Sequence, residues 1–172
     1  MDLKVPVSER DHVRGNRKAR VSLVEYGDFD CPFCAQAFPV VRRLLEQFPT
    51  ELAFVFRHNP RGELHPHARL AAQAGEAAAL QNRFWEMHDL LFEHSGTLEE
   101  VALVRYAREL EVDVDRFQSD LHSAAVRERV RDDEVGGLRS GVIGTPTFFV
   151  NGAHFRDKPD FESLSRAIAK VA

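Results

Sequence analysis

The sequence predicts an α/β protein in which a block of helices interrupts a small layered fold. Three observations support this. A strand–helix–strand pattern occupies residues 20–57, helical periodicity without a strand-like run covers residues 65–140, and strand signals return at residue 147. A strand, a helix and a second strand in this order form a right-handed unit with parallel strands. Without the helical block, the remaining order β-α-β-β-β-α is a compact α/β layer fold.

Length and charge limit the possible classes of protein. The 172 residues have the length of one domain, or of a small domain carrying an insertion, and the 44% hydrophobic fraction is enough for a core. The net charge is −4, and arginines alternate with acids over residues 127–134, so no basic stripe indicates nucleic-acid binding. The sequence leaves the oligomeric state open.

No apolar run approaches the length of a transmembrane helix, and residues 1–16 are polar and charged, without the continuous apolar stretch of a secretory signal. We therefore expect no membrane segment in this chain and a cytoplasmic location. A removed signal or a longer parent chain would be compatible with the same pattern.

The first predicted strand is Arg20–Tyr26, which is apolar nearly throughout, as expected for a strand covered on both faces. Glu25 is the exception, because a carboxylate near the end of a buried strand is costly unless it is paired or functional. Two interpretations stay open. Glu25 is either an exposed strand end paired with an arginine, or a buried carboxylate whose raised pKa lets it relay protons to or from the second cysteine of the chain.

The helix that follows is predicted to begin at Cys31 and to run to Phe48. Pro32 fits the first helical position, where its missing N–H costs nothing. Pro39 lies inside the helical pattern and predicts a kink or a break there. The second strand of the unit is predicted within Glu51–Arg57.

The block between the strands divides into five helical patterns. They cover Pro66–Gln81, Arg83–His94, a helix opened by a capping box at Thr97–Glu100, Asp113–Leu121 and Ser123–Ser140. After the block, Thr147–Val150 is a strand, and Asn151-Gly152 predicts a hairpin whose returning strand is Ala153–Arg156. Asp160 is expected to cap a final helix.

Cys31 and Cys34 are the only cysteines, and they lie where the first strand turns into the helix. The spacing lets both sulfurs close one small ring, and a helix N-terminus offers the first sulfur a partial positive charge and free N–H groups. A thiolate is stabilised there, and the thiolate is the nucleophile in disulfide exchange. The alternatives are chance and half of a zinc site, for which His65 and His67 are the nearest further donors. We predict a redox pair that needs no metal and no organic cofactor.

Two further signals are weaker. Thr145-Pro146 has an ordinary interpretation as a turn leading into a strand, and a sharper one as a cis peptide bond, which sequence alone does not justify. The remaining candidates are histidines without triad-like spacing, most of which are expected to be capping or surface residues: His58, His65, His67, His88 and His154.

The order of these features resembles DsbA-type proteins of the thioredoxin superfamily. Glu25 precedes a Cys-Pro-Phe-Cys sequence at 31–34, a helical block follows, and Thr145-Pro146 comes after the block. Segments with similar family patterns are residues 54–58, 84–88 and 144–152. The resemblance runs from about Arg10 to the last residue, and it is especially strong to the DsbA-like domains fused to the C-terminus of some bacterial Na⁺/H⁺ antiporters.

The resemblance implies a thioredoxin fold with an inserted all-helical domain. Residues 1–172 would form a single DsbA-like domain, with a thioredoxin core at 18–62 and 141–172 and the helical insertion at 63–140. Periplasmic DsbA oxidants have a histidine between the cysteines, where this chain has Phe33. The resemblance therefore implies weaker oxidising power than those relatives have.

The resemblance also assigns roles to the site residues. Cys31 would be the exposed attacking cysteine, Cys34 the buried resolving cysteine, Thr145–Pro146 the cis-proline loop facing them, and Glu25 the buried acid. The implied function is thiol–disulfide exchange with protein thiols and disulfides, together with a redox-recycling partner.

Two other functions are kept beside this one. The first is a redox-sensing or partner-binding module without turnover, which the antiporter-fused relatives suggest. The second is a glutathione-dependent transferase on a related fold, which the second cysteine disfavours.

Overall fold

A computed structural model describes all 172 residues. Five strands form one sheet in the order β1-β3-β2-β4-β5. The strands are β1 (His12–Gly15), β2 (Val21–Gly27), β3 (Leu52–His58), β4 (Thr147–Val150) and β5 (Ala153–His154). β2 pairs in parallel with β3 and antiparallel with β4, and β4 forms a hairpin with β5. The predicted parallel unit and the hairpin are therefore confirmed.

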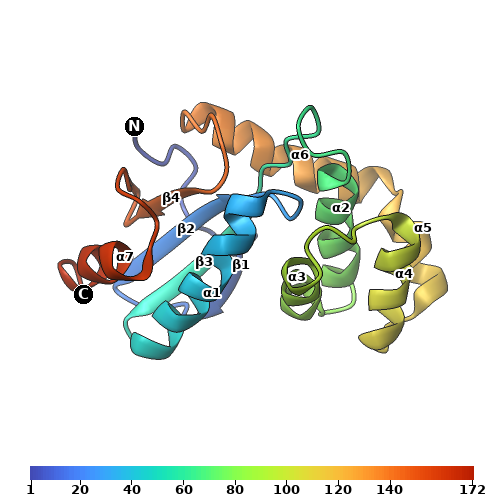
Figure 1. Cartoon of the computed structure of the whole chain (residues 1–172), viewed down its shortest axis with the longest axis horizontal. Helices are drawn as coiled ribbons and strands as arrows, with labels where there is room; N and C mark the ends of the chain where they lie inside the picture. The colour runs from blue at the N-terminus through green and yellow to red at the C-terminus, as the bar shows by residue number, and fades with distance from the viewer.

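The chain also forms seven helices. They are α1 (Pro32–Gln47), α2 (Ala68–Ala79), α3 (Phe84–Glu93), α4 (Glu100–Glu109), α5 (Val114–Leu121), α6 (Ala124–Arg139) and α7 (Phe161–Ala169). Figure 1 shows α1 and α7 beside the strands, and α2, α3, α4 and α5 gathered on one side of the molecule. α6 returns from that group toward β4. The α/β fold with a helical insertion is confirmed.

The strand β1 was missed by the sequence analysis, which placed the first strand at Arg20–Tyr26. β1 pairs antiparallel with β3, with His12 opposite Phe56 and Gly15 opposite Ala53. Three of its four residues are only partly buried. An edge strand of this kind shows no buried apolar run, so only its hydrogen bonding to β3 identifies it.

One expectation about a helix boundary is wrong, and of the kink or break expected at Pro39 the break does not occur. α1 is continuous through Pro39, so the chain does not break there, and Pro39 is exposed to solvent. Thr97 does not cap α4, because that helix begins at Glu100 with Glu99 as its N-cap and without a capping side chain. The carbonyl of Thr97 instead accepts a hydrogen bond from the Tyr106 hydroxyl group at 2.8 Å. The predicted cap at Asp160 is confirmed, because its side chain accepts from the Ser163 N–H.

The hydrophobic core is continuous from the sheet into the helical insertion. One cluster of 30 buried residues includes side chains from β2, β3, α1, α7 and the helices α2 to α5. A smaller cluster on the other face of the sheet contains Val24, Tyr26, Val55, Val142 and Phe149. Beside this cluster, Gly137 of α6 lies so close to Tyr26 that a Cβ atom would approach the ring to 3.1 Å. The absence of side chains at this position lets α6 pack closely against the sheet.

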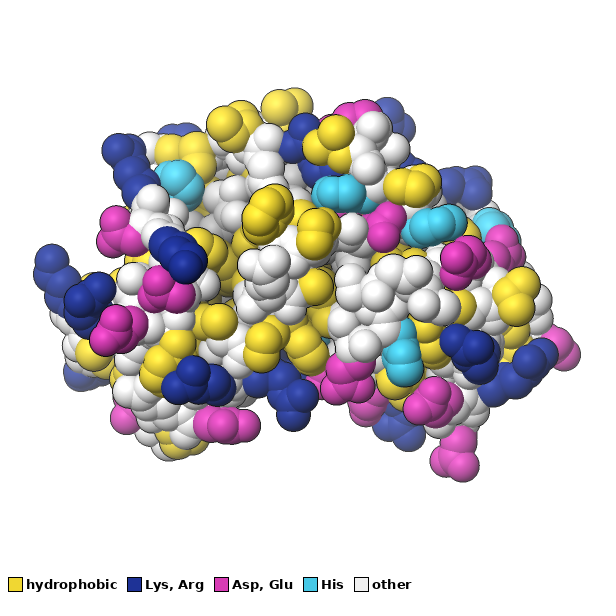
Figure 2. Space-filling view, viewed as in Figure 1, with side chains coloured by type: hydrophobic (Ala, Val, Ile, Leu, Met, Phe, Trp, Pro, Cys, Tyr) yellow, Lys and Arg dark blue, Asp and Glu magenta, His cyan; other side chains and the backbone are white.

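None of the helices combines the length and the apolar character that a bilayer crossing requires. The face shown in Figure 2 has apolar side chains near its middle and most of its charged side chains toward the rim.

Candidate active site

The two cysteines lie where β2 leads into α1. β2 ends at Gly27, a short loop follows, and Cys31 is the N-cap of α1 with an extended backbone conformation. Pro32 occupies the first position of the helix, as the sequence predicts, and Cys34 lies within the first turn. Both cysteines are free thiols. The fold therefore places Cys31 at the positive end of the helix dipole.

The expectation that Cys31 is exposed is wrong. Cys31 is 2% exposed and Cys34 is fully buried, whereas the side chain of Phe33 between them is 64% exposed. The loop before β4 covers Cys31, because Cys31 Sγ lies 3.4 Å from the backbone carbonyl oxygen of Thr145. The Thr145–Pro146 peptide bond is cis, and Pro146 is partly buried. This loop and the cysteines, 114 positions apart along the chain, thus form one site.

Hydrogen bonds favour the thiolate form of Cys31. The hydrogen bond from the Cys34 thiol has the largest effect on the pKa, and the Thr145 side chain and the backbone N–H groups of Cys34 and Phe33 add to it. Partial burial opposes these bonds, but together they lower the pKa of Cys31 to about 5. Cys31 is therefore a thiolate at neutral pH.

Cys34 is affected in the opposite direction. Burial raises the pKa of Cys34 well above its usual value, and the hydrogen bond to Cys31 and the charge of Glu25 raise it further. The backbone N–H of Asp28 donates to Cys34 Sγ at 3.4 Å, which lowers the pKa only in part. Cys34 therefore keeps its proton at neutral pH while Cys31 is charged.

Glu25 is buried, so the interpretation as an exposed strand end is wrong. The residue is 2% exposed, and its Oε1 atom has no hydrogen-bond partner in the protein. Burial, with a smaller contribution from the charge of Cys31, raises the pKa of Glu25 to about 8. Its charge in turn affects Cys34. A carboxyl group with this pKa can take up or release a proton near neutral pH.

The sequence analysis missed Asp28, which holds the loop before the cysteines. Asp28 is 2% exposed, and its carboxylate accepts hydrogen bonds from the backbone N–H of Asp30 at 2.9 Å and of Arg61 at 2.9 Å. It also pairs with His65 Nδ1 at 2.7 Å. The sequence signal was an aspartate between a buried strand and a helix start, where a side chain that accepts backbone N–H groups is common.

His65 is only partly a surface residue, because Asp28 anchors it beside the site. Partial burial alone would lower the pKa of His65, but the hydrogen bond and the charge of Asp28 outweigh burial and raise it. The Cys31 thiolate contributes in the same direction. A protonated His65 adds positive potential near Cys31, which periodicity alone could not predict.

Two other histidines are buried, against the expectation. His58 is fully buried and His88 is 2% exposed. His58 ends β3, and His88 packs among aromatic rings, with centroids 4.8 Å from Phe56, 5.0 Å from Trp85 and 5.0 Å from Phe92. The helical insertion packs against the sheet and buries both rings. Their burial depends on this tertiary contact and could not be predicted from the sequence.

The residues best placed to hold a metal ion are His12, His58 and Glu76, whose ligand atoms lie within 4.8 Å of one another. Both histidines meet the same carboxylate atom, Glu76 Oε1, through Nε2 at 2.8 Å. Hydrogen bonding accounts for these distances. His58 Nδ1 has no partner, whereas a ligating histidine normally donates its other N–H to an acceptor. The cluster therefore fits a hydrogen-bonded link between β1, β3 and α2 better than a metal site.

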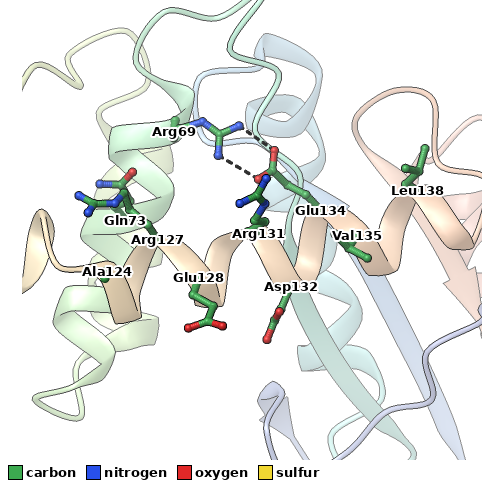
Figure 3. Close-up of a pocket in the computed structure, with 10 residues that line it drawn as sticks. All are labelled: Arg69, Gln73, Ala124, Arg127, Glu128, Arg131, Asp132, Glu134, Val135 and Leu138. Carbon is green, nitrogen blue, oxygen red and sulfur yellow. Dashed lines mark hydrogen bonds and ion pairs between the residues drawn. The ribbon is translucent and has the colours of Figure 1, made fainter.

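A surface hollow of about 760 Å³ lies elsewhere, along α2 and α6, and is shown in Figure 3. Its charged groups partly neutralise one another, because Arg69 binds both carboxylate oxygens of Glu134 at 2.8 and 2.9 Å. None of the site residues predicted from the sequence lines this hollow. It is therefore separate from the cysteine site.

Comparisons with known proteins agree with this geometry. A family model described as Thioredoxin matches residues 7–170. Among curated proteins, the chain is 50% identical over 172 residues to "Na(+)/H(+) antiporter NhaA 1" of Salinispora arenicola and 45% identical over 162 residues to the protein of that name in Mycolicibacterium gilvum. The matches cover 99% and 93% of this chain but 26% of each antiporter. The chain thus spans about a quarter of the length of these relatives.

Solved structures match over nearly the whole chain. A thioredoxin-like oxidoreductase from Silicibacter pomeroyi is 28% identical with a TM-score of 0.85, covering 95% of this chain and 92% of that one. BdbD from Bacillus subtilis is 24% identical with a TM-score of 0.85, covering 96% and 94%. The thiol–disulfide exchange protein alpha-DsbA2 from Wolbachia pipientis is 18% identical with a TM-score of 0.84, covering 95% and 88%.

Proposed function

Because this chain belongs to the thioredoxin family and has the fold of DsbA proteins, we propose that it is an oxidoreductase that exchanges disulfides with protein substrates through Cys31 and Cys34. The observation that supports this most directly is the opposite ionisation of the two thiols. The pKa of Cys31 is lowered to about 5, and that of Cys34 is raised well above its usual value. Cys31 is thus a nucleophilic thiolate, while Cys34 remains a protonated thiol until the second step.

The first step is attack of the Cys31 thiolate on a substrate disulfide. A bond forms between Cys31 Sγ and one substrate sulfur, the substrate S–S bond breaks, and its second sulfur leaves as a thiolate with the electron pair. Backbone N–H groups and the side chain of Thr145 stabilise the attacking thiolate. Since Cys31 is buried beneath the Thr145 carbonyl group, we expect the substrate to approach along the Thr145–Pro146 loop.

The second step is attack of Cys34 on Cys31 Sγ. The Cys31–Cys34 bond forms, the bond to substrate breaks, and the substrate leaves with the electron pair. Cys34 must lose its proton in this step, and Glu25 is the base that we propose accepts it. Once Cys31 is part of a mixed disulfide, it has no charge, and its contribution to the raised pKa of Glu25 disappears. Glu25 thus becomes easier to ionise at the stage when a base is needed.

The surface near the site suits extended protein segments. Three large apolar side chains are exposed near the site, Phe33 in the first turn of α1 and Leu64 and Ile143 on loops, at 64%, 66% and 89% exposure. The backbone carbonyl of Ile143 is hydrogen-bonded to Arg61, whose own N–H binds Asp28, so this loop is tied to the one before the cysteines. A substrate with apolar side chains beside its disulfide would find matching contacts there.

The direction of exchange depends on the partner couple and the compartment. We propose a cytoplasmic setting, in which a recycling partner keeps the pair reduced and the protein reduces substrate disulfides. The mechanism that we propose uses side chains and backbone N–H groups of this chain, a substrate disulfide and the recycling partner.

Reduction of insulin disulfides, measured as turnover with glutathione or dithiothreitol as the reductant, tests the proposal. We expect multiple turnovers with the parent protein and none with Cys31→Ser. A single stoichiometric oxidation without turnover would contradict the proposal. It would favour the second candidate function, a redox-sensing or partner-binding module, which the antiporter names of the curated relatives support.

A further inference from the structure

Two buried residues that line the same small cavity each have a polar atom without a partner in the protein. These atoms are Glu25 Oε1 on β2 and His88 Nε2 on α3. Both residues are 2% exposed. Unpaired polar atoms are costly in a core, at roughly 1–3 kcal/mol each, so two of them beside one cavity indicate a shared partner.

The cavity has the size and surroundings that one water molecule needs. The space open to the centre of a water molecule is about 10 Å³, close to the minimum of roughly 10–15 Å³ for one bound water. Its other lining residues include Arg14 and Arg42, whose side chains are 26% and 53% exposed. The cavity therefore extends from Glu25 toward side chains that reach solvent.

His88 is held in the tautomer that such a water would require. Its Nδ1 atom lies 2.9 Å from Asp89 Oδ1. The Asp89 carboxylate can only accept, since the hydrogen bonds of His88 and Arg14 outweigh burial and lower its pKa. Nδ1 therefore has the proton. Burial in turn lowers the pKa of His88 to about 4, because Asp89 offsets only part of it. The ring is neutral at pH 7, with a free lone pair on Nε2.

We propose that His88, together with Asp89, is the relay through which the Glu25 carboxyl group exchanges its proton with solvent, by way of one water molecule in this cavity. The inference rests on the proposed function, in which Glu25 takes the proton of Cys34. A protonated Glu25 donates to the water, and the water donates to His88 Nε2. The two unpaired atoms thus receive complementary partners through a single molecule.

The proton balance of the relay follows the disulfide chemistry. Before Cys34 closes the disulfide, the protonated Glu25 must release its own proton through the relay, and the resulting carboxylate then takes the proton of Cys34. The carboxyl proton moves to the water as a water proton moves to His88 Nε2, and the Nδ1 proton passes to Asp89, which is 29% exposed and releases it to solvent. When the recycling partner reopens the disulfide, one proton returns by the reverse sequence. Each catalytic cycle therefore restores the original tautomer of His88.

Charged groups on the surrounding elements favour a neutral His88. Arg14 on β1 and the ring of His58 on β3 lower its pKa, whereas Asp89 on its own helix raises it. Arg42 on α1 lines the cavity, and Glu25 faces it from β2. Arg14 also binds both oxygens of Asp89 at 2.9 and 3.0 Å, so the outer end of the relay is fixed in position.

The test follows the resolving step alone. Reduced protein is mixed with excess oxidised glutathione, quenched rapidly in acid, and the glutathione adduct at Cys31 is followed by mass spectrometry. Its formation reports attack by Cys31, and its decay reports attack by Cys34. Both rates are measured from pH 6 to 9, in H₂O and in D₂O. A structural role of His88 would not change the solvent isotope effect of the decay.

We expect His88→Phe and His88→Gln to slow decay of the adduct at least about tenfold, since proton transfer by a positioned group typically contributes a factor of roughly 10²–10⁴. The solvent isotope effect of the decay should rise, and the rate of adduct formation should stay unchanged. Gln can still bind the water molecule but cannot pass a proton across its side chain. The His88→Gln variant therefore distinguishes loss of proton transfer from loss of water binding. His94→Gln, which removes an imidazole just after α3, is the matched control and should behave like the parent.

Asp89→Asn provides a second variant if the His88 substitutions fail to fold. Its amide oxygen can still accept from His88 Nδ1 but takes up a proton poorly, so the decay should again slow. The inference is overturned if the folded variants show the same rate of adduct decay and the same solvent isotope effect as the parent. It is also overturned if His88→Gln alone shows the parent rate and isotope effect. Insulin turnover by the parent tests the proposed function separately, so the two failures are distinguishable.

Discussion

At the scale of single residues, the site depends on the different environments of two neighbouring thiols. Cys31 receives hydrogen bonds that favour its thiolate, and Cys34 lies in the core beside a buried carboxyl group. The sequence predicted the pair and its place at a helix start. The degree of burial of Cys31 and Glu25, and the role of Asp28, came from contacts with distant loops.

The division of labour between the cysteines is tested by trapping. With Cys34→Ser, a mixed disulfide with substrate should accumulate at Cys31, because the resolving nucleophile is missing. With Cys31→Ser, no covalent complex should form at neutral pH, because Cys34 remains protonated. Mass spectrometry of the trapped peptide identifies the linked residue. Trapping at Cys34 in the Cys31→Ser protein would reverse the assignment.

Phe33 offers a test of what sets the redox poise. A protonated histidine in place of Phe33 should lower the pKa of Cys31 below about 5 and stabilise the reduced form, which makes the pair more oxidising. Thiolate absorbance against pH and equilibration with glutathione measure the two effects. Phe33→Leu is the uncharged control. An unchanged pKa and potential in Phe33→His would show that backbone N–H groups, Cys34 and Thr145 dominate instead.

Glu25 should make the free energy of unfolding depend on pH. Its pKa is about 8 in the folded protein and about 4.3 in an unfolded chain, so the folded state binds more protons between these values. Glu25 therefore does not affect stability below pH 4, and it destabilises the fold progressively as pH rises to about 8.

Glu25→Gln should remove this penalty. In denaturant unfolding, the free energy of unfolding of the variant should rise relative to that of the parent by a few kcal/mol as pH increases from 5 to 8.5. One pKa unit corresponds to about 1.4 kcal/mol. Glu46→Gln, an exposed substitution on α1, is the control for loss of a carboxylate. Equal pH profiles for parent and Glu25→Gln would mean that Glu25 ionises at its ordinary pKa.

At the scale of secondary-structure elements, close packing fixes the elements around the site. The absence of a side chain at Gly137 lets α6 approach Tyr26 of β2, and the loop that follows α6 leads to Thr145 and Pro146. Two glycines, Gly136 and Gly137, lie near the end of α6. Their packing role depends on the ring opposite them.

Gly137→Ala tests this packing. Alanine should favour the helix by about 1 kcal/mol, but its Cβ would lie 3.1 and 3.2 Å from two atoms of the Tyr26 ring, and overpacking costs about 1–3 kcal/mol. Because Tyr26 is fully buried and held by Arg57 at 3.0 Å, we expect a net loss of stability in denaturant unfolding. Gly62→Ala, with no atom within 4 Å of its Cβ, is the control. A stabilised Gly137→Ala would show that the ring can move.

At the scale of the whole molecule, a buried polar link joins the helical insertion to the sheet. Glu76 of α2 binds His12 of β1 and His58 of β3, and Asp133 of α6 accepts from the His58 backbone N–H at 3.0 Å. The continuous hydrophobic core also joins these parts. The polar link also fixes how the insertion is oriented on the sheet, because hydrogen bonds depend on direction as well as on distance.

Glu76 should make this link sensitive to acid. Burial opposes its ionisation, but the hydrogen bonds from His12 and His58 outweigh burial and hold the pKa of Glu76 well below its usual range. A carboxylate with a lowered pKa stabilises the fold above about pH 4.3, and the stabilisation is lost as pH falls below that value.

Glu76→Gln should therefore cost about 1.5–3 kcal/mol at pH 7, the range for a hydrogen bond to a charged group, and less at pH 3. Unfolding in urea at both pH values measures the difference. Glu134→Gln at the exposed Arg69 pair should cost at most about 1 kcal/mol and serves as the control. A cost for Glu76→Gln that is the same at both pH values would contradict this account.

The sequence by itself determined the order of the elements, the α/β fold with a helical insertion, and the cysteine pair at the start of α1. Those features depend on local patterns: apolar runs, helical periodicity, a Pro after the first cysteine and an Asn-Gly turn. Only the tertiary structure decided that β1 joins the sheet, that Cys31 is covered by the Thr145 loop, and that Glu25 and His88 line one cavity. These features depend on residues many positions apart, whose meeting is set by hydrogen bonding and packing in three dimensions rather than by any pattern along the chain.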